Sequence, residues 1–240
     1  MISIIKYHFK KQQFLPTYFG MIINPFYIIR KGISKGIRNN SKYINGKLLD
    51  FGCGNKPYES LFNVTEYVGL DIGESGFPEE KSAEIFYDGI TIPFPDNTFD
   101  SVLASEVFEH VFNLDEVLLE LNRVLRKGGN ILVTVPFVWF EHEIPYDFAR
   151  YSSFGLQHVL KKAGFEIVTV EKTTNYLESV IQLFIAYLFN MVFPKNIYIQ
   201  YLLQLLIIFP LSIFLLFWAK LLPSSDKLYC NVVIVAKKII

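Results

Sequence analysis

A short turn near residue 50 carries the residues with the clearest potential for chemistry in this chain. The stretch Lys47–Lys56 reads KLLDFGCGNK, so two leucines lead into Asp50 and then into Gly52, Cys53 and Gly54. Glycine adopts backbone angles, and permits a close approach of ligands, that other residues do not. In open parallel α/β sheets, a strand that leads into such a turn holds a nucleotide-like cofactor at its carboxyl end. The alternative is an ordinary strand-to-loop turn, and the residues around it decide between the two.

The composition of the turn discriminates between classes of cofactor. A dinucleotide-binding turn has a third glycine, which lets the next helix offer its N-terminus to a pyrophosphate. Here Gly54 is followed by Asn55, Lys56 and Pro57 instead. The carboxylate of Asp50 would repel a pyrophosphate, whereas it would attract the ammonium and sulfonium groups of S-adenosylmethionine. The turn therefore favours a positively charged cofactor of that kind.

Strands and helices alternate along the segment that must position this turn. Two apolar runs, 67–71 and 85–88, end on the acids Asp71 and Asp88. Asp71 lies about 20 residues beyond the turn, where a carboxylate can bind both hydroxyls of a ribose. The hydrophobic pattern predicts further strands at 99–105, 130–136 and 165–170, and helices at 106–111, 114–125 and 153–163, the second stopped by the Lys-Gly-Gly run at 127–129. Such alternation predicts a parallel sheet with right-handed crossovers.

Six motifs, in order along residues 46–172, resemble the class I S-adenosylmethionine-dependent methyltransferases of the methyltransferase type 11 kind. They are LLDFGCG at 48–54, GLD at 69–71, IPFPDNTFD at 92–100, EHV at 109–111, LNRVLRKGG at 121–129 and AGF at 163–165. The resemblance implies an α/β fold, a Rossmann-like sheet of six parallel strands and one antiparallel strand with helices on both faces. Residues 229–236, which read YCNVVIVA, fit the antiparallel seventh strand.

The same resemblance assigns residues to the cofactor S-adenosylmethionine. Asp50, Gly52, Cys53 and Gly54 are expected to line its methionine part, Asp71 to bind its ribose, Asp88 and Gly89 to lie beside its adenine, and Ser105 and Glu106 to close the pocket after the fourth strand. The glycine and acid positions match the pattern of the family well, whereas the residues beside the adenine vary within it.

The loop after the fifth strand, in such a fold, lies over the methyl group of the cofactor. Its sequence PFVWFEHEIPYDFARY, residues 136–151, resembles a subgroup of bacterial methyltransferases that are often linked to surface-glycan pathways. A hydroxyl acceptor must lose its proton, and His142 is the only group of the loop that titrates near neutral pH. We expect His142 to act as the general base and Asp147 to orient it or bind the acceptor. Arg150 is expected to hold an anionic group such as a phosphate.

Alternatives to these assignments stay open. In the first alternative, Asp147 and Arg150 form an ion pair that only braces the loop and takes no part in binding the acceptor. His110, which follows the fourth strand, is the rival general base, although a structural or substrate-orienting role fits it as well. The other histidines, His8 and His158, are not spaced with acids or cysteines as a ligand set, so we expect no metal site.

The balanced net charge of the chain hides a strong partition. Residues 1–47 hold nine basic residues and no acid, whereas residues 48–175 hold 21 acids and nine basic residues. The basic segment is also apolar and aromatic, most of all between Met21 and Ile29. Basic residues beside apolar surface are typical of a membrane-interface segment, because anionic lipids attract each charge by roughly 1 kcal/mol. Nucleic acid is the competing partner, but we disfavour it because an aliphatic run gains nothing from phosphates.

A long apolar insertion separates the sixth and seventh expected strands. Residues 179–194 and 196–219 carry no charge, and the second stretch has the length of a membrane-spanning helix. Both ends of the insertion join one sheet, so it must be a hairpin that either crosses the membrane an even number of times or lies at its interface. We therefore expect attachment to the cytoplasmic face of a membrane through residues 1–38 and 179–219. The alternative is a homodimer whose interface buries the hairpin.

These observations predict one principal domain with two additions. We expect an arm at 1–45 and a methyltransferase domain at 46–240, interrupted by the hairpin at 176–223. The two cysteines, Cys53 and Cys230, do not suggest disulfides, which agrees with a reducing cytosolic face.

The expected function is S-adenosylmethionine-dependent O-methylation of a lipid-linked or membrane-proximal glycan-type acceptor by in-line transfer. One alternative is a methyltransferase of a soluble small molecule, with the apolar segments in a dimer interface. The other is a non-catalytic membrane scaffold that retains the fold.

Overall fold

The computed structural model describes residues 10–73 and 82–239, so the first nine residues of the expected arm lie outside the described part. The chain divides into two compact units. One comprises Met1–Lys35 and Lys172–Asn231, and the other comprises Gly36–Glu171 and Val232–Ile240. Most of the expected arm and the whole expected hairpin therefore fall in the same unit, and the sheet belongs to the other.

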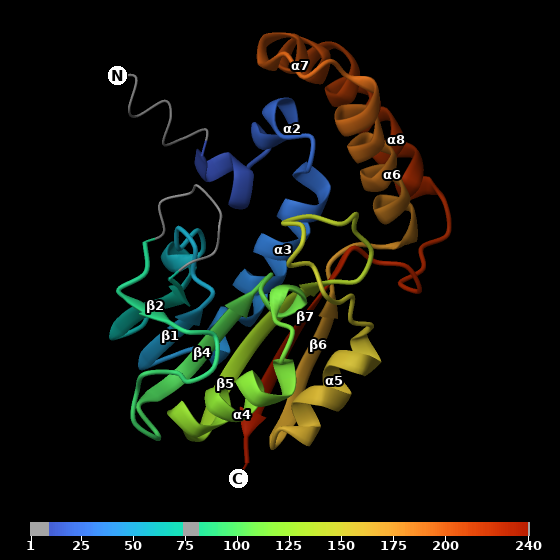
Figure 1. The fold of residues 1–240 in the computed structure, drawn as a ribbon. Coiled ribbons are helices and arrows are strands. Elements are labelled where there is room, and N and C mark those ends of the chain that lie inside the picture. The colour runs from blue at the N-terminus through green and yellow to red at the C-terminus, as the bar shows by residue number, and fades with distance from the viewer. Residues whose placement is uncertain (1–9, 74–81, 240) are drawn as a thin grey trace. The chain divides into compact units, whose positions relative to one another are not determined.

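A seven-stranded sheet forms the core of the second unit. Its strands are β1 (Lys47–Phe51), β2 (Glu66–Ile72), β3 (Ile85–Tyr87), β4 (Phe99–Ser105), β5 (Leu125–Pro136), β6 (Phe165–Lys172) and β7 (Asn231–Lys238). They lie in the order β3-β2-β1-β4-β5-β7-β6 (Figure 1). The pairs β1–β2, β1–β4, β2–β3 and β4–β5 are parallel. The strand order reverses at β1, which is where open α/β sheets bind their ligands.

Strand β7 runs against β6. The N–H of Ile239 donates to the carbonyl of Gly164 at 3.2 Å, and the N–H of Thr173 donates to the carbonyl of Asn231 at 2.9 Å. The start of each strand thus meets the end of the other, which is an antiparallel arrangement, and the two arrows point in opposite directions in Figure 1. The expected fold, a Rossmann-like parallel sheet with an antiparallel seventh strand, is confirmed.

The central strands are near-continuous apolar runs. Residues 102–104, 131–133 and 232–236 are each at most 1% exposed. Strands that are covered on both faces have this composition, whereas a strand with one solvated face would alternate.

Two α-helices of this unit, α4 (Leu114–Val124) and α5 (Ser153–Lys162), flank the sheet (Figure 1). The buried residues of α4 recur with helical spacing, at Leu114, Val117, Leu118, Leu121 and Val124. Ser152 caps α5 by accepting a hydrogen bond from the N–H of Gly155. Short 3-10 turns lie at Ser41–Tyr43, Glu59–Leu61 and Phe108–His110.

Two expectations about local structure are wrong. The helix expected at 106–111 is a single 3-10 turn, Phe108–His110. The run 127–129 does not stop α4, which ends at Val124, but lies inside β5. Gly128 has a φ of +82°, and the register between β4 and β5 shifts between Phe99 and Ser101. A glycine in the left-handed region allows such an irregularity in a strand. A glycine that ends a helix has the same local sequence pattern, so the sequence alone does not distinguish the two.

The first unit is helical where the structure describes it. Its elements are α2 (Gly20–Ile23), the first part of α3 (Tyr27–Asn40), α6 (Tyr176–Tyr187), α7 (Ile197–Leu203) and α8 (Phe209–Leu221), with π-helical turns at Leu188–Val192 and Gln204–Ile208. From α7 to α8 the helix is unbroken. Pro210 lacks an N–H group, and the wide turn just before it accommodates the missing backbone hydrogen bond.

A small apolar core joins the N-terminal segment to the apolar insertion. Tyr27 and Ile28 pack against Ile181, Ile185 and Ile208. Part of the apolar surface that was expected to face lipid is therefore buried within this unit.

Amide side chains of the insertion fix this packing. Gln182 is fully buried, accepts a hydrogen bond from the N–H of Ile29 at 3.1 Å and donates to the carbonyl of Pro25 at 3.0 Å. Gln204 donates to the carbonyl of Met21 at 3.2 Å. Buried amides need such partners, so the N-terminal segment and the insertion pack together within this unit.

The run Ile197–Leu221 is long and apolar enough to cross a membrane. It has 25 residues, a mean hydropathy of 2.4 in its most apolar window, and only 17% of that window is buried. The helical run Tyr176–Val192 is also apolar but shorter. A core helix of a soluble protein would pass the test of length and composition, but it would be mostly buried.

Candidate active site

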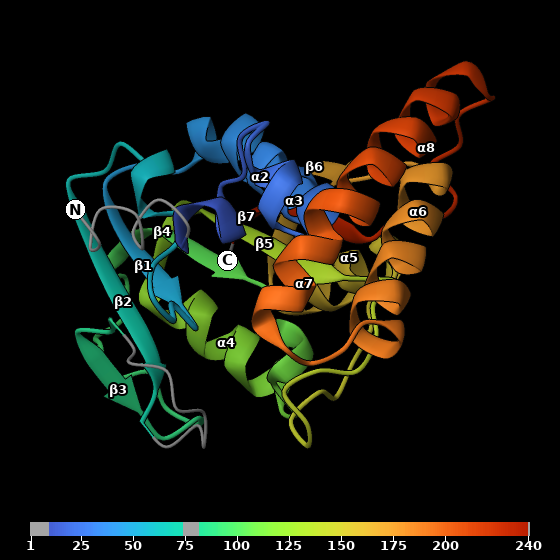
Figure 2. The same ribbon diagram turned by 90° about the horizontal axis from the view of Figure 1, so that it is seen from above.

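The glycine turn after β1 lies at the carboxyl end of the parallel strands, in the sheet that Figure 2 shows from above. The N–H groups of Gly52 and Cys53 donate to the carbonyl of Leu70 at 2.8 and 3.2 Å. Gly52 and Gly54 have φ values of +69° and +49°. A Cβ on Gly52 would lie 2.3 Å from Cγ2 of Val107, whereas a Cβ on Gly54 would meet nothing within 4 Å. Gly52 is thus required by packing, and Gly54 leaves space beside the turn.

Asp50 is a buried carboxyl directly before this turn. It is 3% exposed, and the hydroxyl of Tyr67 donates to its Oδ2 at 2.6 Å. Burial raises the pKa of Asp50 to about 7, although the Tyr67 hydrogen bond and the charge of Lys56 both lower it. A positively charged ligand beside Asp50 would favour its ionised form.

Cys53 lines the turn as an inert thiol. It is 3% exposed, and burial, followed by repulsion from Asp50, raises the pKa of its thiol to about 12. The thiolate is the nucleophile in cysteine chemistry, so Cys53 is not a nucleophile at neutral pH.

Asp71 ends β2 beside the turn. Its Oδ2 accepts a hydrogen bond from the N–H of Gly54 at 2.8 Å, and its Oδ1 accepts one from the N–H of Ile72 at 2.8 Å. A carboxylate offers about four lone-pair sites, so it can bond to the backbone and to a ligand at once. The structure thus brings Asp71 together with the glycines that precede it by about 20 residues.

Asp88 and Gly89 follow β3, two strands away from β1 in the sheet. The Oδ1 atom of Asp88 accepts hydrogen bonds from the N–H groups of Ile90 and Thr91 at 2.9 and 3.0 Å, and these bonds lower the pKa of Asp88. Asp88 is exposed and closes a turn, while Gly89 has a φ of +83°. Their expected position beside an adenine stays a prediction.

Ser105 and Glu106 are held by a residue that the sequence analysis did not single out, Thr134 of β5. Its hydroxyl lies 2.9 Å from Oγ of Ser105 and donates to Oε1 of Glu106 at 2.7 Å. Glu106 has a φ of +54°, a conformation that costs a non-glycine residue free energy, and its N–H donates to the carbonyl of Thr134 at 2.9 Å. The signal in the sequence was a polar residue inside the apolar run 131–135, which forms the buried half of β5.

The loop after β5 stands at the carboxyl end of the sheet (Figure 1) and is braced from within. Arg150 donates to both carboxylate oxygens of Asp147 at 2.5 and 2.6 Å, and to the carbonyls of Ala149 and Phe140 at 2.8 and 3.1 Å. The guanidinium holds the pKa of Asp147 well below its usual range, chiefly through these bonds. Because the Nη groups of Arg150 bind the loop itself, the geometry agrees with the bracing alternative, and capture of an anionic acceptor stays a prediction.

Two histidines face each other beside this brace. The ring centroids of His110 and His142 are 4.9 Å apart at an interplanar angle of 76°. Nδ1 of His142 lies 3.2 Å from Oδ2 of Asp147, and Nδ1 of His110 lies 2.9 Å from the carbonyl oxygen of Tyr146. Burial, followed by repulsion from His110, lowers the pKa of His142. This shift favours the neutral imidazole of His142, which is the form that can accept a proton.

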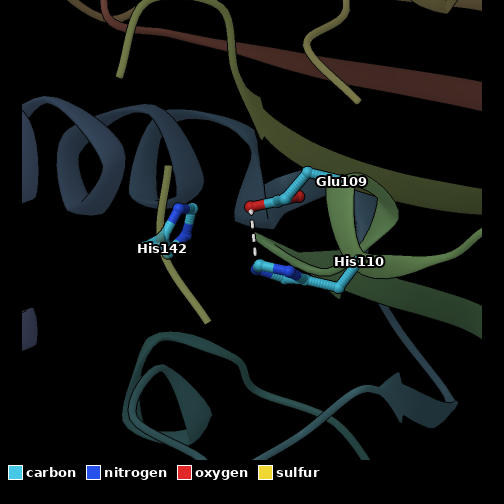
Figure 3. A group of neighbouring side chains, drawn as sticks. All are labelled: Glu109, His110 and His142. Atoms are coloured by element: carbon cyan, nitrogen blue, oxygen red, sulfur yellow. Dashed lines mark ion pairs between the residues drawn. The ribbon is translucent and has the colours of Figure 1, made fainter. Parts of the chain in front are cut away.

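Glu109 completes this group, although the sequence points to it only as the first residue of the EHV motif. It comes from the same 3-10 turn as His110, is 0% exposed, and its Oε1 lies 3.9 Å from Nε2 of His110. Figure 3 shows Glu109 and His110 on one side and His142 on the other. Burial, followed by repulsion from Glu106, raises the pKa of Glu109 well above its ordinary value. No sequence pattern could have joined Glu109 to His142, because the fold alone brings the two segments together.

Exposed apolar side chains surround the histidine pair. Phe112, Ile144, Tyr146 and Phe148 are 84%, 70%, 48% and 46% exposed, and the rings of Phe112 and Phe148 lie 5.5 Å apart. Clustered exposed apolar residues mark sites of interaction more often than single ones do.

Residues 49–133 match the family described as "Methyltransferase domain". Among curated proteins, the fatty-acid O-methyltransferase of Mycolicibacterium smegmatis is 32% identical over 152 residues, which cover 58% of this chain and 55% of that protein. In the curated relatives, the matched stretches cover between about a quarter and about half of the relative's own length.

Solved structures share the fold at low sequence identity. The S-adenosylmethionine-dependent methyltransferase of Archaeoglobus fulgidus has a TM-score of 0.54 at 19% identity, covering 86% of this chain and 93% of the other. The [4+2]-cyclase SpnF has a TM-score of 0.53 at 19% identity, covering 88% and 82%. The same architecture thus serves more than one reaction, and the reaction has to be argued from the site.

Proposed function

We propose that this chain transfers a methyl group from S-adenosylmethionine to an oxygen of its acceptor. The premise is that it belongs to the class I S-adenosylmethionine-dependent methyltransferase family. The observation that carries this proposal is the hydrogen bond of 2.8 Å from the N–H of Gly54 to Asp71. It sets the carboxylate that resembles the ribose-binding acid of the family beside the glycine turn. Methyl transfer is favoured over cyclisation because the fatty-acid O-methyltransferase matches this chain in sequence as well.

The residues around the turn fit this cofactor. Asp50 is a buried carboxyl whose ionised form needs a positive partner, and the sulfonium and ammonium of S-adenosylmethionine supply one. Gly54 leaves space where a side chain would stand, and Asp71 would hold the ribose hydroxyls. When bound, the cofactor supplies an electrophilic methyl group on sulfur.

On the acceptor side, His142 is the proposed general base. Its backbone N–H donates to Oδ2 of Asp147 at 2.9 Å, and its Nδ1 lies 3.2 Å from the same oxygen, so the proposed base uses the tautomer with its hydrogen on Nδ1 and its lone pair on Nε2. Asp147 is in turn fixed by Arg150. A base positioned in this way contributes about 10²- to 10⁴-fold to the rate. His110, whose Nδ1 is turned to the carbonyl of Tyr146, is assigned to orienting the acceptor.

The proposed acceptor is lipid-linked or membrane-proximal and of the glycan type. The exposed apolar residues around the histidines support an acceptor with an apolar part. By its name the relative from Mycolicibacterium smegmatis acts on a fatty acid, which is another apolar acceptor methylated on oxygen.

We further propose that the protein is attached to the cytoplasmic face of a membrane. Support comes from the low burial of the run Ile197–Leu221 and from the exposed aromatic residues Phe214, Phe217 and Trp218, which are 58%, 59% and 49% exposed. The basic N-terminal segment, with Tyr18 83% exposed, adds an electrostatic attraction to anionic lipid. A homodimer that buries the same helices around a small-molecule acceptor is the second candidate, favoured by the same exposed surface.

Calorimetry with S-adenosylmethionine tests the cofactor site. Asp71→Ala should weaken binding by about tenfold or more, since charge-assisted hydrogen bonds contribute roughly 1.5–3 kcal/mol. The matched control is Asp115→Ala, which removes an exposed carboxylate paired with Lys162 at 2.6 Å and should leave the affinity unchanged. Equal affinities for the Asp71 variant and the parent protein would refute this role of Asp71.

Fractionation of cells without detergent tests the proposed attachment. The parent protein is expected in the membrane fraction, because apolar burial contributes about 25 cal/mol per Å². A parent protein found in the supernatant as a stable dimer would refute attachment and support the second candidate. A membrane protein that binds no S-adenosylmethionine would instead support the scaffold alternative.

A further inference from the structure

We propose that a divalent transition-metal ion binds between Glu109, His110 and His142. Each of these residues offers one ligand atom, and the three atoms lie within 4.8 Å of one another. Figure 3 shows that they come from two segments, Glu109 and His110 from the turn after β4 and His142 from the loop after β5. This inference goes beyond methyl transfer and does not depend on it.

The orientation of His110 leaves its metal-binding nitrogen available. Its Nδ1 lies 2.9 Å from the carbonyl oxygen of Tyr146, which can only accept, so Nδ1 carries the hydrogen. The lone pair is then on Nε2, the atom that lies 3.9 Å from Oε1 of Glu109. A backbone carbonyl on the distal nitrogen is a common support of a metal-binding histidine.

His142 is oriented in the same way by a carboxylate. Oδ2 of Asp147 lies 3.2 Å from Nδ1 of His142, closer than the guanidinium of Arg150 at 3.5 Å. Arg150 holds Asp147 as a carboxylate, so the tautomer of His142 with its hydrogen on Nδ1 would face an acceptor and leave the lone pair on Nε2 for a metal. A carboxylate behind the histidine raises the basicity of the ligand and fixes its ring.

Glu109 supplies the third ligand and an independent reason for a cation. Its side chain is fully buried, and within the described residues neither carboxylate oxygen has a hydrogen-bond partner. Burial of a carboxyl group without partners is costly, and metal coordination is one of the ways in which proteins offset that cost.

The charges around the three ligands also favour a cation. Glu106 and Asp147 act on Glu109 as neighbouring negative charges, and the positive charge of Arg150 opposes them. Glu143, at the exposed rim, places Oε2 3.8 Å from Nε2 of His110 and offers a fourth oxygen.

The donor set indicates the class of metal. Two imidazole nitrogens and one carboxylate oxygen suit Zn²⁺ or another first-row divalent ion, with a position left open for water or a substrate oxygen. Zinc ligands lie about 2.0–2.2 Å from the ion, so binding must draw the three side chains closer together than they are here. Metal binding engages Nε2 of His142, so it excludes the use of that nitrogen as a base. The general-base role proposed above therefore belongs to the metal-free protein.

The test is a zinc titration of the chelator-treated full-length protein, by calorimetry and by competition with a chromophoric chelator. One site is expected, and Glu109→Gln and His142→Ala should each weaken it by at least tenfold. Asp147→Asn should weaken it by about 10- to 100-fold, the usual effect of losing a supporting partner. The matched control His158→Ala, an exposed histidine of α5, should leave the affinity unchanged.

Two results would overturn the proposal. One is the lack of stoichiometric zinc binding, and the other is binding that Glu109→Gln and His142→Ala leave unchanged. Glu109→Gln keeps the size of the side chain and removes a buried charge, so it is the variant that tests the site without a cavity. Circular dichroism and S-adenosylmethionine calorimetry on the same variants show whether the fold is kept. They also separate a failure of the metal site from a failure of the proposed function.

Discussion

Acidification should weaken S-adenosylmethionine binding, because binding requires the ionised form of a carboxyl that is half protonated near neutral pH. Burial raises the pKa of Asp50 to about 7, repulsion from Asp71 and Glu59 reinforces the shift, and Tyr67 and Lys56 oppose it. A bound sulfonium or ammonium favours the ionised form and lowers this pKa again. Cofactor binding and deprotonation of Asp50 are therefore linked.

The size of the effect follows from this pKa. In the cofactor-free protein, about 90% of Asp50 is ionised at pH 8 but only about 1% at pH 5. If only the ionised form binds, the affinity falls by about 90-fold over this range, or about 2.7 kcal/mol. Binding at pH 6 should release about 0.9 proton, and binding at pH 8 about 0.1.

The raised pKa of Asp50 also makes the stability of the cofactor-free fold depend on pH. The pKa of Asp50 is 3.8 in an unperturbed carboxyl and about 7 in the fold, so the folded state binds the proton more tightly. The contribution of Asp50 to stability is therefore fully present below pH 3.8 and is lost as the pH rises through 7. Asp50→Asn should abolish this loss, so thermal unfolding of the cofactor-free variant should depend less on pH than that of the parent.

Calorimetry between pH 5 and pH 8, in buffers with different ionisation enthalpies, measures both the affinity and the protons released. Asp50→Asn is the control for titration of the cofactor itself, and it should bind more weakly at pH 8 and show no proton release that is centred near pH 7. The same pH dependence in the variant and the parent would refute the assigned role of Asp50.

Other predictions test the packing of the site and of the insertion. Gly52→Ala should destabilise the fold by about 1–3 kcal/mol, because its Cβ would clash with Val107. The Cβ of Gly54→Ala would meet no atom within 4 Å, so this variant should mainly weaken cofactor binding. Chemical denaturation and calorimetry on the two variants separate these effects, and equal destabilisation by both would contradict the reasoning. Arg150→Gln should lower the free energy of unfolding by about 1–3 kcal/mol, because Asp147 then keeps only the hydrogen bond from the N–H of His142, and denaturant titration that shows no loss would contradict the bracing role. Replacement of 176–223 by a short linker should release the protein from membranes and retain S-adenosylmethionine binding, and persistence of the variant in salt-washed membranes would contradict attachment through the insertion.

Much of the sheet could be predicted because its strands are buried on both faces. The strand expected at 99–105 matched the observed bounds, and its centre, residues 102–104, is apolar and buried as expected for a strand covered on both faces. The run around Gly128 misled the prediction, because a glycine that ends a helix and a glycine inside an irregular strand have the same local signature. Tertiary pairing between β4 and β5 decided between the two.

The candidate site was predictable where it lies on one strand end and not where the fold joins distant segments. Asp50, Gly52 and Gly54 are neighbours in the sequence, and strand pairing brings Asp71 to them. The group formed by Glu109 and His142 depends on the path of a loop, which hydrophobic periodicity does not encode. The packing of helices within the first unit could not be predicted for the same reason. Gln182 and Gln204 lie in apolar runs, and nothing in the local sequence indicates that their amides bond to the N-terminal segment.

Transfer of a labelled methyl group from S-adenosylmethionine into a membrane extract, in the presence of a chelator, tests the central claim most directly. The parent protein should label an acceptor that partitions with lipids. His142→Ala should lower turnover by about 10²-fold or more with the cofactor affinity nearly unchanged, and His158→Ala should match the parent. Labelled product formed equally well by His142→Ala would contradict the general-base assignment. A parent protein that binds the cofactor but labels nothing in extracts of its own membranes would contradict the claim that it is a methyltransferase of a membrane acceptor.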